Sequence, residues 1–243
     1  MYINSHKKMK QKVIIASILY MICTLVAPAQ EVHQVKSVEP RLEDVYNVLN
    51  DLGIYVFRFD LSSFLDDVYE VEGYVAEYKK NRPTENVHTF QLGNNIGFLD
   101  DIPEEHQQEI RDAYQIPKGE NHWDKIKDLT ICIRHTDKKD STANIKFSST
   151  RLGTMSRSFK LQPIARWGIY QYESRPFLLL AEEKEEYREI PLILYGSWWE
   201  EPGTTIYRFC GERKIDPELQ SEILKHIPHY YLIGIRMKKK NSK

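Results

Sequence analysis

The chain has 243 residues, with 34 lysines and arginines against 35 aspartates and glutamates, and its formal net charge is −1. This balance, without a basic block, argues against a nucleic-acid-binding protein and against attachment to an anionic membrane surface. The 15 tyrosines, 9 phenylalanines and 4 tryptophans argue against a disordered chain, because aromatic side chains of this abundance fill a packed core.

The N-terminus has the parts of a secretory leader. Four lysines precede the apolar stretch Val13–Val26, and Ala27-Pro28-Ala29 provides the small residues of a cleavage site. We predict a signal peptide over residues 1–29, which directs the mature chain to the periplasm or the cell exterior. The apolar stretch is shorter than the about 20 residues of a membrane span, so no span is expected after cleavage. Loss of the four leader lysines changes the net charge from −1 to −5.

A polar arm and a helix follow the leader. Residues 30–39 are polar and are predicted to form an exposed arm before a single globular domain over residues 40–243. Pro40 stands where a helix favours proline, apolar residues then recur at spacings of three and four, and Gly53 closes the run. The pattern predicts an amphipathic helix over residues 40–52.

Strand patterns fill most of the remaining chain. Alternating apolar and polar residues between short turns predict strands at 54–59, 68–78, 87–92, 128–135, 143–149, 157–163, 167–173, 176–181, 189–195, 204–210 and 230–237. Two further helices are predicted at residues 103–114 and 216–227. Because short turns join neighbouring strands, we predict an α+β fold of mainly antiparallel sheet. The expected form is a sandwich or a strongly curved sheet with about three peripheral helices.

Two cysteines remain after removal of the leader, Cys132 and Cys210. Each lies on the more polar face of its predicted strand, and the extracytoplasmic environment permits a disulfide. We predict that the two are bonded to each other, with two independent buried thiols as the alternative.

The best candidate for a binding site is Trp198-Trp199-Glu200-Glu201, at the end of a predicted strand. Exposed indoles stack on sugar rings, and neighbouring carboxylates accept hydrogen bonds from sugar hydroxyls. Successive residues of a strand face opposite sides, so we expect one indole to be partly exposed and the other to be buried. The alternative is that both tryptophans close one end of the core.

No pattern in the chain is typical of catalysis, a cofactor or a metal. The sequence lacks G-x-S-x-G, a P-loop and G-x-G-x-x-G. His226 and His229 are the one close histidine pair, but Pro228 separates them and no further ligand stands at a familiar spacing. We interpret them as histidines at a helix end. The adjacent acid pairs also lack the spacing of a calcium loop, and adjacent carboxylates do not face each other across a glycosidase cleft.

The basic leader ending in Ala27-Pro28-Ala29, followed by a long aromatic and β-rich segment without a motif, resembles the uncharacterised exported proteins of Bacteroides-type gut bacteria. The resemblance is one of general character over the whole chain, and it implies no activity and no site residues. Three functions stay open. The first is a non-enzymatic envelope module that binds a glycan, a peptide or another envelope protein. The others are an envelope hydrolase acting through carboxylates and an inhibitor or immunity-like protein. The binding module is favoured, because aromatic residues are plentiful and no catalytic signature is present.

Overall fold

The computed structural model describes residues 39–164, 168–179 and 187–240. The predicted signal peptide and all but the last residue of the predicted arm lie outside the described residues. Residues 41–243 form one compact unit. Its described α-helices are α2 (Leu42–Asp51) and α3 (Glu104–Tyr114), and most of its other elements are antiparallel strands. No helix of the described ranges is long and apolar enough to cross a membrane.

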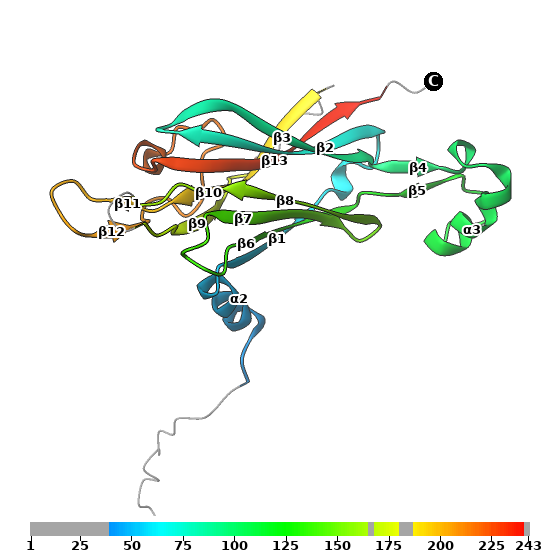
Figure 1. The fold of residues 1–243 in the computed structure, drawn as a ribbon. Coiled ribbons are helices and arrows are strands. Elements are labelled where there is room, and N and C mark those ends of the chain that lie inside the picture. The colour runs from blue at the N-terminus through cyan, green and yellow to red at the C-terminus, as the bar shows by residue number, and fades with distance from the viewer. Residues whose placement is uncertain (1–38, 165–167, 180–186, 241–243) are drawn as a thin grey trace, which may run out of the picture. The chain divides into compact units, whose positions relative to one another are not determined.

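Two antiparallel sheets form the body of this unit and lie as two layers (Figure 1). The first has the order β1-β6-β7-β8 and the second has the order β3-β2-β13-β10-β9. The strands of the first are β1 (Ile54–Asp60), β6 (Asp128–Arg134), β7 (Thr142–Ser149) and β8 (Leu152–Lys160). Those of the second are β2 (Tyr69–Lys79), β3 (Arg82–Asn94), β9 (Tyr172–Pro176), β10 (Tyr187–Ser197) and β13 (His229–Lys239). The short pairs are β4 (Ile96–Phe98) with β5 (His122–Asp124) and β11 (Trp199–Glu200) with β12 (Tyr207–Arg208).

The main core lies between the two sheets. Strand β6 shows how the sequence builds it, since Leu129, Ile131 and Ile133 are fully buried while the residues between them are partly exposed. The inward faces of β10 and β13 meet this layer with Ile193 and Ile233. Burial of these apolar side chains is the main source of stability of the fold.

The outer face of the five-stranded sheet is covered as well. A second core there joins Leu194 and Leu232 of the sheet to Phe209, Ile215 and Leu224 of the chain that follows β12. Strands β10 and β13 are therefore buried on both faces, which explains why their sequences read as nearly continuous apolar runs.

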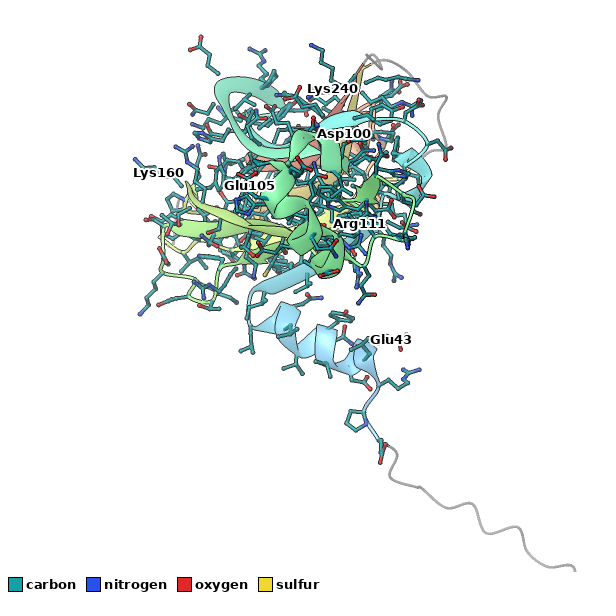
Figure 2. The ribbon with its side chains drawn as sticks, turned by 90° about the vertical axis from the view of Figure 1, so that its right-hand side faces the viewer. Glu43, Asp100, Glu105, Arg111, Lys160 and Lys240 are labelled. Atoms are coloured by element: carbon teal, nitrogen blue, oxygen red, sulfur yellow. The ribbon has the colours of Figure 1, made fainter. Side chains whose placement is uncertain are left out.

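A smaller excursion, residues 96–124, leaves the sheets between β3 and β6. It contains β4, α3 and β5 and has its own small core of Leu99, Ile116 and Trp123. Helix α3 agrees with the helix predicted at 103–114. The surface of the excursion is acidic, and Figure 2 shows Asp100 and Glu105 on it.

The helix predicted over residues 216–227 is wrong. The structure has a turn there, with Leu219 at a φ of +60°, followed by a 3-10 helix over Glu222–Lys225. Local side chains bind the backbone groups that a helix would use. The hydroxyl of Ser221 accepts a hydrogen bond from the amide of Asp216 at 2.8 Å, and the Glu212 carboxylate accepts one from the amide of Glu222 at 2.7 Å. Such bonds compete with helix formation.

Other boundaries also differ from the prediction. The strands predicted at 167–173 and 176–181 correspond to the single strand β9, and parts of both lie outside the described residues. The strand predicted at 204–210 is reduced to the two residues of β12.

The predicted bond between Cys132 and Cys210 is absent, and both thiols are free. Cys132 lies on the face of β6 that points away from the main core. Cys210 follows Phe209, which packs on the outer face of the other sheet. Both sheets separate the two thiols, and a disulfide needs Cα atoms within about 7 Å.

Gly53 joins α2 to β1 at a φ of +72°, which favours glycine. A Cβ atom there would lie 2.0 Å from the carbonyl oxygen of His135. We expect Gly53→Ala to lower the free energy of unfolding by about 3 kcal/mol, from backbone strain and from this clash. Gly203→Ala is the matched control, since Gly203 has a φ of +77° and open space around it. Urea unfolding should show that the control lowers the free energy of unfolding by about 1 kcal/mol. Equal losses for Gly53→Ala and Gly203→Ala would contradict the clash.

Candidate functional site

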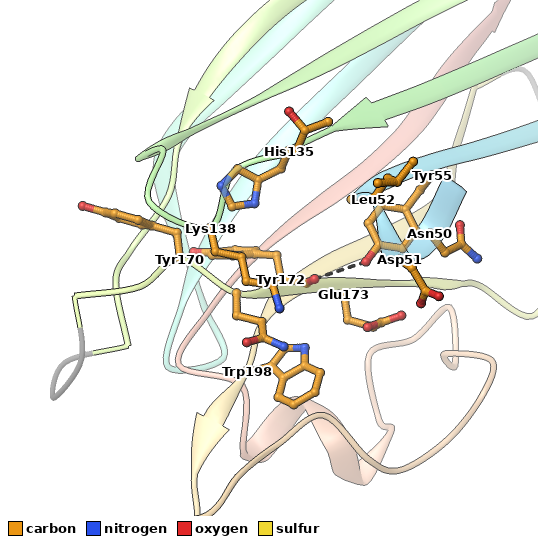
Figure 3. A pocket seen from close by; sticks show the side chains of 13 residues that line it. Asn50, Asp51, Leu52, Tyr55, His135, Lys138, Tyr170, Tyr172, Glu173 and Trp198 are labelled. Carbon is orange, nitrogen blue, oxygen red and sulfur yellow. Dashed lines mark hydrogen bonds between the residues drawn. The ribbon is translucent and has the colours of Figure 1, made fainter. Parts of the chain in front are cut away.

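Two adjoining hollows lie where β1 and β9, the edge strands of the two sheets, approach each other. The first, called here the Trp198 hollow, has a volume of about 180 Å³. Its wall includes the aromatic residues Trp198, Tyr170, Tyr172 and Tyr55 (Figure 3). The second, called here the β1 hollow, has a volume of about 420 Å³ and lies farther along β1.

Trp198 reaches its hollow from the end of β10. Its amide donates a hydrogen bond of 2.9 Å to the carbonyl of Gln171, which extends the pairing of β10 with β9. Trp198 is half-buried, whereas Trp199 is 5% exposed and stacks on the ring of His226 at 5.7 Å. The asymmetry expected from strand alternation is therefore confirmed.

The two acids of the predicted site lie elsewhere. Neither Glu200 nor Glu201 lines the Trp198 hollow, and Glu201 forms an ion pair of 3.1 Å with Arg208 on the paired strand β12. The structure thus keeps Trp198 as a candidate contact and separates it from the carboxylates that follow it in sequence.

Tyrosine rings form the floor of the hollow. The hydroxyl of Tyr55 donates a hydrogen bond of 3.3 Å to the carbonyl of Tyr172, which ties the edges of the two sheets together (Figure 3). The rings of Tyr172 and Tyr195 lie 5.0 Å apart. Burial raises the pKa of all three phenols above the ordinary value, so they stay neutral. Tyr55 and Tyr172 form hydrogen bonds through their hydroxyls, whereas Tyr195 lies behind the floor and packs through its ring.

Different carboxylates line the hollow, those of Glu173 and Asp51. Burial raises the pKa of Glu173; Arg175, 3.3 Å away, acts against this shift, and the charge of Asp51 adds to it. Lys138 is a cation on the same wall. Sequence reasoning missed Glu173, because a single acid within a short strand has no local signal that separates it from a solvated one.

A buried polar network supports Tyr172 from behind. Its hydroxyl lies 2.5 Å from Nδ1 of His229, and Nε2 of His229 lies 2.9 Å from the Glu77 carboxylate. A carboxylate only accepts hydrogen bonds, so Nε2 bears the proton and Nδ1 accepts from the phenol. Burial lowers the pKa of His229, although Glu77 acts in the opposite direction. The ring is therefore neutral.

Glu77 has further donors. Although burial acts to raise its pKa, hydrogen bonds from Asn86, His229, Lys79 and Thr84 together lower it to about 2. Asn86 and Thr84 donate to the second carboxylate oxygen, at 2.6 Å and 3.1 Å. The interpretation of His229 as a helix-end residue is wrong, because it begins the buried strand β13 and is 0% exposed. Its role depends on a glutamate 152 positions away in sequence, which no local pattern reveals.

The described residues contain no group of three or more histidine, cysteine or acidic side chains that could hold a metal ion.

The fold and the site define a two-layer antiparallel β protein with an aromatic and polar hollow between the edges of its sheets. The chain belongs to a family of unknown function: the model of the domain of unknown function DUF5041 matches residues 24–239. No curated protein and no solved structure matches the chain.

Proposed function

We propose that this protein is a non-enzymatic binding module of the cell envelope that holds a carbohydrate in the Trp198 hollow. The observation that supports it is the half-buried indole of Trp198 beside polar side chains in a concave site. Sites for small ligands combine aromatic walls with a few placed polar groups in this way.

The chemistry of the wall suits a sugar ring. The apolar face of a sugar packs on an aromatic ring, while its hydroxyls need donors and acceptors around the rim. Asn50, Gln171 and Lys138 offer donors, and Glu173 offers an acceptor. The bonded Tyr55 and Tyr172 fix the shape of the floor before a ligand arrives, which lowers the entropic cost of binding.

Export to the periplasm or cell exterior is part of the proposal. Its support is the leader pattern of residues 1–29. Mass spectrometry of the native protein should find a mature N-terminus at Gln30 and no peptide from residues 13–26. An intact leader in purified envelope protein would contradict export with cleavage.

Carbohydrate binding is tested by calorimetry with a panel of neutral, amino and acidic oligosaccharides. We expect Trp198→Ala to lower the affinity for the sugar by about tenfold or more, which corresponds to a loss of about 1.4 kcal/mol in binding free energy. Trp198→Phe keeps an aromatic ring and should therefore lose less affinity than Trp198→Ala. Phe98→Ala is the matched control, since this half-buried aromatic belongs to the 96–124 excursion. Unchanged binding by Trp198→Ala, or no sugar bound by the wild type, would contradict the proposal.

A hydrolase acting through carboxylates is the second candidate. The raised pKa of the half-buried Glu173 supports it, since a carboxyl group with a raised pKa suits general acid catalysis, and Asp51 lines the same hollow. Chromatography of the sugars after incubation separates the two functions. Cleavage that Glu173→Gln abolishes would favour the hydrolase, and intact sugars favour the binding module. An inhibitor or immunity-like role has less support, namely the acidic surface of the 96–124 excursion.

A further inference from the structure

Strand β1 has one open edge. Among the described strands, it pairs with β6 alone. The carbonyl of Gly53 accepts a hydrogen bond from the amide of His135, and the amide of Leu61 donates to the carbonyl of Lys127. In an antiparallel pair alternate residues face the partner strand. The odd-numbered residues of β1 therefore bond to β6, and the even-numbered ones point their N–H and C=O groups away from it.

The other open edges carry features that discourage strand pairing. Strand β9 contains Pro176, which has no N–H, and its carbonyl already accepts a hydrogen bond from the amide of Ile215. Strand β3 contains Pro83, and β8 contains Arg157 and ends at Lys160. Proline and charged side chains are the usual protection of sheet edges. Strand β1 has the sequence IYVFRFD, without proline or lysine. Its two charged side chains are both engaged, Arg58 by Asp128 and Asp60 by the amide of Ser62.

The β1 hollow runs beside this open edge. Its walls are Val56 and Phe57 of β1, Tyr46 of α2 and Pro176 of β9, and Arg213 lies at its border. Val56 is 36% exposed and Tyr46 is 42% exposed. An extended chain placed along β1 would meet open backbone groups on one side and this partly apolar space, which Asn50, Glu173 and Ser174 also line, on the other.

The charges beside the hollow are mostly compensated. Arg175 lies 3.3 Å from Glu173, and Arg58 lies 2.8 Å from Asp128. Arg213 is exposed and forms no ion pair in the described part of the chain. The hollow therefore has a surplus positive charge, which a carboxylate would match.

We propose that an extended peptide segment of a partner protein adds to the open edge of β1 as a further strand. Its backbone pairs with the N–H and C=O groups of Val56 and Arg58, an apolar side chain enters the β1 hollow, and an acidic side chain lies opposite Arg213. Strand addition of this kind obtains affinity from main-chain hydrogen bonds and specificity from pockets for alternate side chains. The docking does not depend on carbohydrate binding.

The probe is a fluorescein-labelled peptide of about eight residues, a usual strand length, in which valine and threonine alternate around one glutamate. A second peptide has lysine in place of glutamate. Val56→Pro removes an outward N–H that β6 does not use, and Val56→Thr keeps this N–H. We expect the wild type and Val56→Thr to bind the glutamate peptide, and Val56→Pro to bind it about tenfold or more weakly in fluorescence anisotropy.

A charge reversal provides the second test, which also decides the case if Val56→Pro fails to fold. Arg213→Glu should prefer the lysine peptide, whereas the wild type prefers the glutamate peptide. The proposal would be overturned if a folded Val56→Pro bound the glutamate peptide as tightly as the wild type does. It would also be overturned if Arg213→Glu still preferred the glutamate peptide. Absence of peptide binding by the wild type would overturn it too. A dimer that sedimentation detects in the wild type and not in Val56→Pro would mean that a second copy occupies the edge. These peptide-binding results are independent of whether Trp198→Ala loses sugar binding, so the two proposals are tested separately.

Discussion

Replacing Trp199 with alanine should lower the free energy of unfolding by about 3–5 kcal/mol, the usual cost for a core aromatic. Trp199 is 5% exposed, its ring stacks on His226, and it lies 5.8 Å from the ring of Phe209. Truncation would leave a large cavity in the second core, between the outer face of the five-stranded sheet and the segment that covers it. Urea unfolding followed by circular dichroism measures the loss.

Trp198→Ala is the matched control for this experiment. The two residues are adjacent in sequence, but Trp198 is half-buried at the rim of a hollow, so its loss should be about 1 kcal/mol. Equal and large losses for both variants would place both indoles in the core and would remove Trp198 as a ligand contact.

The second large effect is expected at Glu77. Glu77→Ala removes the acceptor for His229, Asn86 and Thr84, and it leaves Nε2 of the fully buried His229 without a partner. Hydrogen bonds to a charged group contribute about 1.5–3 kcal/mol each, and an orphaned buried donor adds its own cost. We expect a loss of about 3–4 kcal/mol in urea unfolding.

Glu70→Ala is the control on the same strand, because Glu70 is exposed and its replacement should change stability by less than about 0.5 kcal/mol. A loss at Glu77 no larger than that at Glu70 would show that the network contributes nothing to stability.

The same network makes stability depend on pH. The pKa of Glu77 is about 2 in the folded protein and 4.5 in its ordinary state. Between these values the unfolded chain takes up a proton that the folded chain does not, so stability falls as the pH decreases. The contribution is complete above the ordinary pKa and is lost as the pH approaches 2. The lowered pKa of His229 acts in the same direction, beginning below its ordinary value of 6.5.

Glu77→Gln isolates this effect, since glutamine keeps an acceptor for His229 and does not titrate. Thermal melting between about pH 6 and 3 should show a shallower loss of stability in Glu77→Gln than in the wild type. Parallel pH profiles would contradict the assigned pKa of Glu77.

Local patterns in the sequence determined much of the fold. Apolar spacing predicted α2, and α3 was predicted from its composition, while alternation predicted β1, β2, β6 and β13 within a few residues. Short turns predicted antiparallel pairing, which every sheet confirms. Alternation also predicted that Trp198 and Trp199 differ in burial. These features depend on residues near each other in the chain, where periodicity and side-chain size decide the outcome.

The tertiary structure alone decided the features that depend on distant segments. Ile215, Ile223 and Leu224, which were predicted in or beside the last helix, instead pack with a turn and a 3-10 helix against Leu194 and Leu232 of the sheet. Cys132 and Cys210 lie on opposite sides of two sheets, so they remain free. The order of strands left β1 with an open edge and brought Glu173 beside Asp51. Strand order, layer and buried polar pairing arise from contacts between segments far apart in sequence, and no local pattern of residues encodes them.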